Sequence, residues 1–131
     1  MLLESDRLGA IEVDETSLVE VDGGLLGFES IHRFALIQAD DAGAYSWLQA
    51  VDDPGLAFLA VVPSFFFPDY EPDVPDDPAD AQVLCLVTIA GDDITANLMG
   101  PVVMNVANRT ARQVVLVDQG WTTREPLVKV G

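Results

Sequence analysis

The chain has 131 residues, half of them apolar, and a formal net charge of −16 at pH 7. This apolar fraction excludes a disordered acidic tail, and the length suffices for one domain whose core needs neither disulfides nor metal. Direct binding of nucleic acid is excluded as a function class, because phosphate contacts need Lys and Arg side chains and the chain has only six.

The positive charges lie toward the two ends of the chain. No Lys or Arg occurs between residues 34 and 108, a span that holds twelve carboxylates. A surface of this kind favours solubility and fast association with a basic partner. An acidic surface that is merely solvated, with no specific partner, is the alternative that composition leaves open.

The cysteine content and the apolar runs indicate a cytoplasmic protein. Cys85 is the only cysteine, so no internal disulfide can form and a reducing compartment is expected. The N-terminal sequence MLLESDRLG lacks the basic and apolar regions of a signal peptide. The longest apolar run, from Leu56 to Phe67, is interrupted by Pro63 and is too short to span a bilayer, so no membrane contact is expected.

In the N-terminal segment, apolar and charged side chains alternate. Ile11 and Val13 are two residues apart, as are Val19 and Val21, and a glutamate stands inside each pair. This period places the aliphatic side chains on one face of a sheet and the carboxylates on the other. The polar residues 14–17 between the pairs predict a turn, so the pattern indicates a hairpin.

Three glycines between residues 23 and 27 predict a tight reversal, because glycine adopts positive φ without strain. A phosphate-binding loop is the weaker interpretation. It would need a lysine and a hydroxyl before a helix, and neither is present.

Three strands are predicted next, over residues 33–38, 45–51 and 56–62. Apolar and aromatic side chains dominate them, as is usual in strands. Residues 40–43 form the first connection. Residues 52–55, with sequence DDPG, form the second, because proline and then glycine suit the successive positions of a tight turn.

After the third strand the chain enters a segment that is both aromatic and acidic. Three consecutive phenylalanines, residues 65–67, are followed by Pro68, Asp69, Tyr70 and Glu71. Prolines at positions 72, 75 and 78 remove backbone donors and exclude a helix interior. We therefore expect residues 72–80 to form an extended acidic surface segment that starts from an aromatic anchor.

The same segment carries carboxylates at a calcium-loop spacing. Asp69, Glu71, Asp73, Asp77 and Asp80 would occupy positions 1, 3, 5, 9 and 12 of such a loop. Position 6 is a valine where the loop requires glycine, and the flanking residues cannot be helical. A solvated acidic loop is therefore favoured, and metal binding is kept as the alternative.

The C-terminal half predicts further strands. Residues 82–89 form the most strand-like run, followed by 94–99, 102–106, 113–117 and a last pairing over 126–130. No long window has the 3.6-residue period of a helix. Many short strands separated by turns indicate an all-β single domain over residues 1–131, with an antiparallel barrel-like or sandwich fold.

No side chains form a recognisable catalytic set. His32 is the only histidine, and no sequence neighbour supplies a carboxylate or hydroxyl at a catalytic spacing. Cys85 lies inside an apolar strand, where burial should raise the pKa of its thiol. Asn97 and Asn105 are expected to satisfy backbone groups at bends. The sequence therefore favours a binding protein that is not an enzyme and uses no cofactor or metal.

A series of motifs runs along nearly the whole chain. In chain order they are Gly27-Phe28-Glu29, Trp47-Leu48-Gln49 through Asp53-Pro54, Leu56-Ala57-Phe58, Phe66-Phe67-Pro68-Asp69-Tyr70-Glu71, Thr95-Ala96-Asn97-Leu98, Pro101-Val102-Val103 with Asn105, and Arg112-Gln113-Val114-Val115-Leu116. As a set, this order resembles the flagellar assembly factor FliW family. The chain departs from the family pattern at Leu26, where a proline is usual, at Glu125, where a histidine is frequent, and in a shorter segment after Glu71.

The resemblance implies a single all-β, barrel-like domain without catalytic activity in the bacterial cytosol. It implies binding to the RNA-binding translational regulator CsrA, which would relieve repression of flagellin messenger RNA. Family members also bind flagellin, so accumulating flagellin would remove the protein from CsrA in a partner switch. The acidic charge fits this expectation, because CsrA needs a basic surface for RNA and would attract an acidic partner.

The candidate contact surface combines aromatic and acidic side chains, which suit an interface with apolar anchors and a charged rim. At least one of the three phenylalanines is expected to point into the core. Two alternative functions are kept: an acidic calcium-binding module, and a flagellin chaperone without a role toward CsrA. The candidate residues are Asp52, Asp53, Phe66, Phe67, Asp69, Tyr70 and Glu71.

Overall fold

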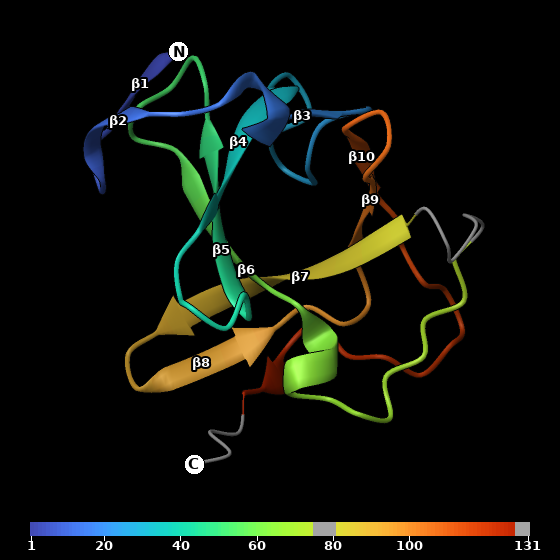
Figure 1. Ribbon diagram of the computed structural model, residues 1–131. Coiled ribbons are helices and arrows are strands. Elements are labelled where there is room, and N and C mark those ends of the chain that lie inside the picture. The colour runs from blue at the N-terminus through green and yellow to red at the C-terminus, as the bar shows by residue number, and fades with distance from the viewer. Residues whose placement is uncertain (75–80, 128–131) are drawn as a thin grey trace.

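The computed structural model describes residues 1–74 and 81–127 (Figure 1). In this part of the chain the regular elements are strands and two short 3-10 helices, which confirms the predicted all-β class. None of the described helices is long and apolar enough to cross a membrane. The elements are β1 (Leu2–Ser5), β2 (Gly9–Glu12), η1 (Glu15–Ser17), β3 (Leu18–Val21), β4 (Arg33–Gln38), β5 (Tyr45–Ala50), β6 (Ala57–Val61), η2 (Pro63–Phe65), β7 (Ala81–Ala90), β8 (Asp93–Ala96), β9 (Val102–Asn105), β10 (Thr110–Gln113) and β11 (Glu125–Pro126).

Seven of the strands close into a barrel. Around the ring the order is β7-β6-β5-β4-β3-β10-β9, and β9 pairs again with β7. Neighbours are antiparallel except β3 and β10, which run parallel where Glu20 and Val21 lie opposite Thr110 and Ala111. A ring with an odd number of strands cannot alternate direction throughout, so at least one pair must be parallel. The barrel predicted to be antiparallel is therefore mixed.

The long strand β7 belongs both to the barrel and to an outer layer. Its residues 81–84 pair with β9, residues 85–86 with β6 and residues 87–90 with β8. β11 adds to the other side of β8. The second half of β7 thus leaves the barrel and supports a small extension, visible at the lower left of Figure 1.

Two of the three hydrophobic clusters of the described residues lie on the two faces of β7. Adjacent residues of β7 face opposite sides, so Leu84 packs in one core and Cys85 in the other, as the continuous apolar run of β7 predicts. The barrel core includes Val19, Val21, Phe34, Leu48, Leu84, Val102 and Met104. The outer core consists of Val61, Tyr70, Cys85, Ala96, Leu98 and Leu116, with partly buried neighbours.

The N-terminal hairpin predicted over residues 11–21 is wrong. β2 pairs with β1, whereas β3 pairs with β4 and β10. The polar residues between them form η1, which begins after Asp14, and the Asp14 carboxylate accepts from the Thr16 N–H at 2.9 Å. This helical turn sends β3 into the barrel, while β1 and β2 pack outside β4 with Leu3 and Val13 buried. Alternation predicts which side chains turn inward, and it carries no information about the neighbouring strand.

The central strands and the turn between them are confirmed. β4 has the predicted bounds, and those of β5 and β6 differ from the prediction by one residue at most at each end. The side chain of Asp53 accepts from the Gly55 N–H at 3.1 Å in the turn that joins β5 to β6. Local signals decide this hairpin, because its strands and its turn are contiguous in sequence.

The strand predicted over residues 94–99 ends early. β8 ends at Ala96, and Asn97 bends the chain because its Oδ1 accepts from the N–H groups of Met99 and Gly100 at 3.1 and 2.9 Å. Asn97 therefore has the backbone role predicted for it. Asn105 has the same role, since its Oδ1 accepts from the N–H of Ala107 at 3.0 Å.

The bounds predicted for the strand over residues 113–117 are wrong. β10 is shifted toward the N-terminus and spans Thr110–Gln113. Beyond it, Val114 N–H still donates to the carbonyl of Pro101 at 2.9 Å. Proline has no N–H to donate in return, so the strand ends at Gln113, and beyond it single bonds such as Leu116 N–H to the Met99 carbonyl at 2.7 Å replace the full ladder. The last predicted pairing, over 126–130, is confirmed only in β11, and residues 128–130 lie outside the described part. Residues 75–80 of the expected acidic segment also lie outside it.

The predicted glycine-rich reversal is confirmed. Gly23 and Gly24 have φ of +75° and +69°, and Leu25 and Phe28 form an isolated antiparallel bridge. The ring of Phe28 then packs edge to face on Phe58 of β6, with 5.2 Å between ring centroids. The turn is thereby fixed against the barrel.

Gly24 provides a test of this turn. A Cβ at Gly24 would lie 2.6 Å from the Glu29 Cα, whereas a Cβ at Gly23 would meet no atom within 4 Å. We expect Gly23→Ala to cost about 1 kcal/mol for its positive φ, and Gly24→Ala to cost about 3 kcal/mol because steric overlap is added. Urea unfolding of both variants measures the difference, and equal costs would contradict the close approach.

Candidate functional site

The candidate site is centred on the exit segment, defined here as residues 63–74, which leaves the barrel after β6. Pro63 is buried and begins η2, where the fixed φ of proline suits a first helical position. Residues 67–70 then form a turn in which the Tyr70 N–H donates to the carbonyl of Phe67 at 3.0 Å. Pro68 occupies the second position of that turn, which proline favours. The two prolines therefore set the path of the segment.

Tyr70 anchors the exit segment in the outer core. Its side chain is 9% exposed, and its hydroxyl donates to the carbonyl of Leu98 at 2.7 Å. Its ring packs edge to face on Trp121 with 4.7 Å between centroids. Burial raises the pKa of the Tyr70 phenol and raises the pKa of the Cys85 thiol to about 12, so both groups are neutral at pH 7. Cys85 is thus buried in its thiol form, as predicted, and cannot act as a nucleophile.

Hydrogen bonds to Gln119 fix the C-terminal end of the exit segment at Asp73. The Asp73 N–H donates to the Gln119 Oε1 at 3.1 Å, and the Gln119 Nε2 donates to the Asp73 carbonyl at 3.3 Å. With Tyr70 buried and Asp73 paired, the backbone between them is fixed before any partner binds. A fixed surface loses less conformational entropy on binding than a free loop.

The three phenylalanines point in different directions. A 3-10 helix turns by about 120° per residue, so alternation does not apply to η2 and the residues after it. Phe66 packs edge to face on Tyr45 at 5.3 Å, and Phe66 and Phe67 both lie against the outer core. Phe65 is 51% exposed. The expectation that at least one phenylalanine packs inward is confirmed, and Phe65 is the exposed one that sequence reasoning missed.

The signal for Phe65 was present in the sequence. Pro63, two residues before the phenylalanine run, begins a helical turn, and this turn places Phe65, the fourth residue after β6, away from the two faces of the strand. Reading Phe65 to Phe67 as a continuation of the strand hides this.

Exposed carboxylates lie in the exit segment and in the β4–β5 loop. Asp69, Glu71 and Asp73 are all exposed, and Asp41 is exposed in the β4–β5 loop. That loop reaches the same end of the barrel, because the Val62 N–H donates to the Ala44 carbonyl at 2.9 Å. Within residues 1–74 and 81–127, no salt bridge engages these four carboxylates. Their charge is therefore available to a partner.

Asp52 and Asp53 lie at the other end of the β5–β6 hairpin. Both are exposed in the turn near the N-terminus in Figure 1, whereas η2 lies at the opposite end of β6. The five residues of β6 separate the two ends by about 17 Å at 3.3 Å per residue. The buried Gln49 amide holds the turn by donating from Nε2 to the carbonyls of Asp53 and Leu56 at 3.1 and 3.0 Å. The seven candidate residues thus form two separate groups, and Tyr70 supports the surface from inside.

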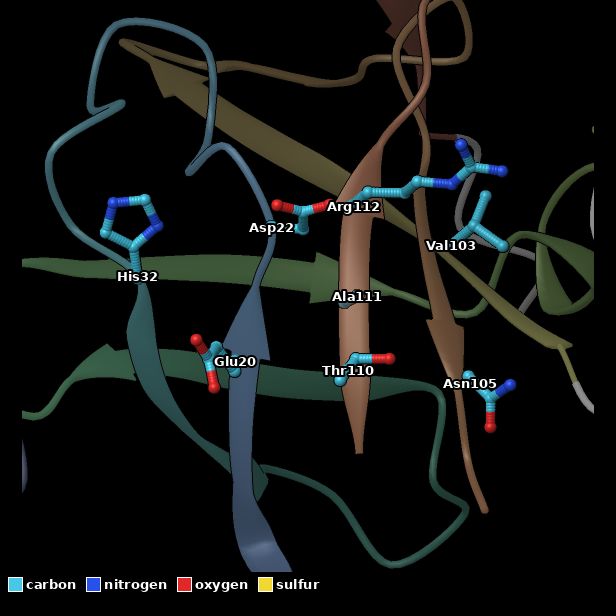
Figure 2. A pocket seen from close by; sticks show the side chains of 8 residues that line it. All are labelled: Glu20, Asp22, His32, Val103, Asn105, Thr110, Ala111 and Arg112. Carbon is cyan, nitrogen blue, oxygen red and sulfur yellow. The ribbon is translucent and has the colours of Figure 1, made fainter. Parts of the chain in front are cut away.

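A second possible site is a hollow of about 400 Å³ that crosses β3, β10 and β9. Figure 2 shows Thr110 and Arg112 on β10, between Glu20 on β3 and Asn105 on β9. His32 lines the same hollow just before β4, and its Nδ1 lies 3.2 Å from the carbonyl oxygen of Val21. This backbone contact agrees with the packing or surface role predicted for the histidine.

The hollow is less suited to protein docking than the exit segment. Its apolar side chains, Val103 and Ala111, are 3% and 4% exposed and present little area to a partner. Among residues 1–74 and 81–127, no three His, Cys, Asp or Glu side chains are placed to hold a metal ion. Asp77 and Asp80 of the calcium-loop spacing lie outside those ranges. The exit segment, with an exposed aromatic ring and a carboxylate rim, has the composition of a protein-binding surface.

Comparison with known proteins gives a consistent result. A family model described as FliW protein matches residues 2–127. The flagellar assembly factor FliW of Treponema denticola is 38% identical over 141 residues, which cover 98% of this chain and 94% of the relative. That of Moorella thermoacetica is 38% identical over 141 residues, with 98% and 89% covered. A crystal structure of the flagellar assembly factor FliW matches with a TM-score of 0.87 at 31% identity, over 98% of this chain and 97% of that chain.

The different burial of Phe65 and Phe66 can be tested by truncation. We expect Phe66→Ala to lower the free energy of unfolding by about 2 to 3 kcal/mol, because the ring packs against Tyr45 and the outer core. Phe65→Ala should change it by less than about 0.5 kcal/mol, since that ring is exposed. Urea unfolding gives both values, and a large cost at Phe65 would show that its ring is part of the core.

Proposed function

The chain belongs to the FliW family of flagellar assembly factors, which are not enzymes, and we propose that it binds the RNA-binding translational regulator CsrA. Through this contact the protein would relieve the repression of flagellin messenger RNA by CsrA. The place of action would be the bacterial cytoplasm, where CsrA and its messenger RNA are found.

One observation carries the proposal. The exit segment carries the exposed ring of Phe65 and, four and six residues later, the exposed carboxylates of Asp69 and Glu71, in a stretch of chain without any Lys or Arg from residue 34 to residue 108. An RNA-binding protein needs a basic surface, and an acidic surface attracts it over a long range. Long-range attraction brings the two proteins together, and burial of the aromatic ring in the contact would then stabilise the complex.

We also propose flagellin as a second partner. Competition between flagellin and CsrA for the protein would connect flagellin synthesis to its export. Asp52 and Asp53 remain in the proposal as a separate contact, since they lie about 17 Å away along β6. A partner that touches both groups must extend along the β5–β6 hairpin.

Charge reversal tests the contact with CsrA. We expect Asp69→Lys/Glu71→Lys to lower the association rate with purified CsrA about tenfold at low ionic strength, and the difference to shrink as salt is added. Surface plasmon resonance measures the rate, and co-elution in size exclusion shows the complex. Phe65→Ala in the same assay tests the apolar part of the surface.

The matched control is Glu4→Lys/Asp92→Lys. Both residues are exposed and outside the exit segment, in β1 and in the turn between β7 and β8, and the change in net charge is the same. This variant should associate faster than Asp69→Lys/Glu71→Lys. Equal rates for the two variants would mean that the exit segment is not the docking site, and no co-elution of the unaltered protein with CsrA would overturn the proposed function.

Two alternatives are distinguished by further measurements. An acidic calcium-binding module would release or absorb heat when calcium is titrated into the protein in a calorimeter, and we expect no heat beyond dilution. A flagellin chaperone without a role toward CsrA would co-elute with flagellin and not with CsrA. Either of those results would replace the present proposal.

A further inference from the structure

The segment after β10 has one hydrogen-bonded side and one open side. On the bonded side, Val114 N–H donates to the Pro101 carbonyl at 2.9 Å and Leu116 N–H to the Met99 carbonyl at 2.7 Å. Backbone groups of successive residues in an extended chain point to opposite sides. The N–H and C=O groups of Val115 and the N–H of Val117, where a turn with Asp118 begins, therefore point away, and in the described part of the chain no hydrogen bond occupies them.

This open side continues the side of β10 on which β3 pairs. The carbonyl of Ala111 faces that side, since it accepts from the Asp22 N–H at 2.7 Å. β3 pairs with β10 only at residues 110 and 111, and the chain of β3 turns away at Asp22. Residues 113–117, called the open edge below, thus extend β10 beyond the end of its neighbour. In Figure 1 this part of the chain lies at the right of the molecule.

The side chains of the open edge alternate between core and solvent. Val114 and Leu116 pack in the outer core. Val115 and Val117 are 47% and 64% exposed. Natural sheet edges are usually protected by lysine, proline or a bulge, and the sequence QVVLV has neither lysine nor proline. Unpaired backbone groups beside exposed β-branched side chains are the features that an added strand uses.

The open edge is fixed at both ends. At its start, the Gln113 Oε1 accepts from the Leu26 N–H and its Nε2 donates to the Gly100 carbonyl, both at 2.8 Å. After its end, Gln119 makes two hydrogen bonds with the backbone of Asp73. An added strand would therefore meet a rigid template and order little of the protein.

The charges around the open edge specify the occupant. Asp118 follows the edge and is exposed, and Asp73 is exposed at the other side of the Gln119 contact. We propose that the open edge binds an extended peptide segment as an antiparallel strand, with apolar side chains opposite Val115 and Val117 and a basic residue beside Asp118. This inference goes beyond the proposed function and does not depend on it, because its test uses neither CsrA nor flagellin.

The test uses the peptide acetyl-Lys-Val-Thr-Val-Thr-Val-amide. In antiparallel register its valines lie opposite residues 117, 115 and 113, and its lysine comes next, at the turn that contains Asp118. Amide hydrogen exchange is measured by NMR with and without saturating peptide. The amides of Val115 and Val117 should exchange at least about tenfold more slowly with peptide, since each becomes hydrogen-bonded. The same peptide with glutamate in place of lysine should bind more weakly.

A matched pair of variants separates backbone pairing from side-chain contact. Val115→Pro removes an N–H that points to solvent and leaves the bonds of Val114 and Leu116 in place. It should weaken peptide binding at least about fivefold. Val115→Thr keeps the N–H and the β-branched shape, so its affinity should stay within about twofold. Unaltered unfolding by urea shows that each variant is folded.

Three results would overturn the inference. The first is unchanged exchange at Val115 and Val117 in millimolar peptide. The second is equal affinity of Val115→Pro and Val115→Thr for the peptide. The third is protection of these amides that depends on protein concentration without peptide, because the occupant would then be a second copy of the chain.

Discussion

Closure of the seven-stranded ring is the constraint on which the other features depend. Because seven is odd, one pair of neighbours must run parallel, and the chain meets this requirement where β10 lies beside β3. Strands that run parallel cannot be joined by a tight turn. The chain therefore completes the rest of the ring and starts the outer layer between β3 and β10. The exit segment and β8 belong to that intervening chain, and β11 completes the extension after β10.

The outer layer needs a core of its own. The second half of β7 leaves the barrel, so one face of the strand would be in water if nothing covered it. Tyr70 and the neighbouring aromatic rings from the exit segment cover it, and the Tyr70 hydroxyl satisfies the carbonyl of Leu98, which would otherwise be buried without a donor. Packing thus accounts for the inward members of the aromatic run. It does not account for Phe65, whose ring is 51% exposed and belongs to none of the hydrophobic clusters of the described residues.

Sequence reasoning succeeded where the determining contacts are local. The bounds of β4, the β5–β6 hairpin and the bend at Asn97 depend on alternation, turn residues and side-chain-to-backbone bonds within a few residues. It failed where a partner distant in sequence decides the outcome. Nothing in residues 11–21 says that β2 will pair with β1, and nothing in residues 113–117 says that Pro101 will face them.

The sequence predicted which residue types make up the candidate site, and it did not predict how those residues are arranged in space. The carboxylates and aromatics of the exit segment were identified from their residue types alone. Their separation from Asp52 and Asp53 follows from the length of β6, which can be used only once β6 is known to pair with β5 along its whole length. The exposure of Phe65 follows from a 3-10 turn that interrupts the two-residue period of the strand.

Hydrogen bonds connect the exit segment to the chain that follows the open edge. Gln119 lies two residues after the open edge, and its side chain makes two hydrogen bonds with the backbone of Asp73 in the exit segment. Movement of the open edge would therefore strain these two bonds, and so would movement of the exit segment. The two surfaces also share a sign of charge, through Asp73 and Asp118. Two partners that used one surface each would therefore bring like-charged, basic groups close together, and their mutual repulsion would oppose simultaneous binding. Exclusion of one partner by another would then need no overlap of their contacts and no change of fold.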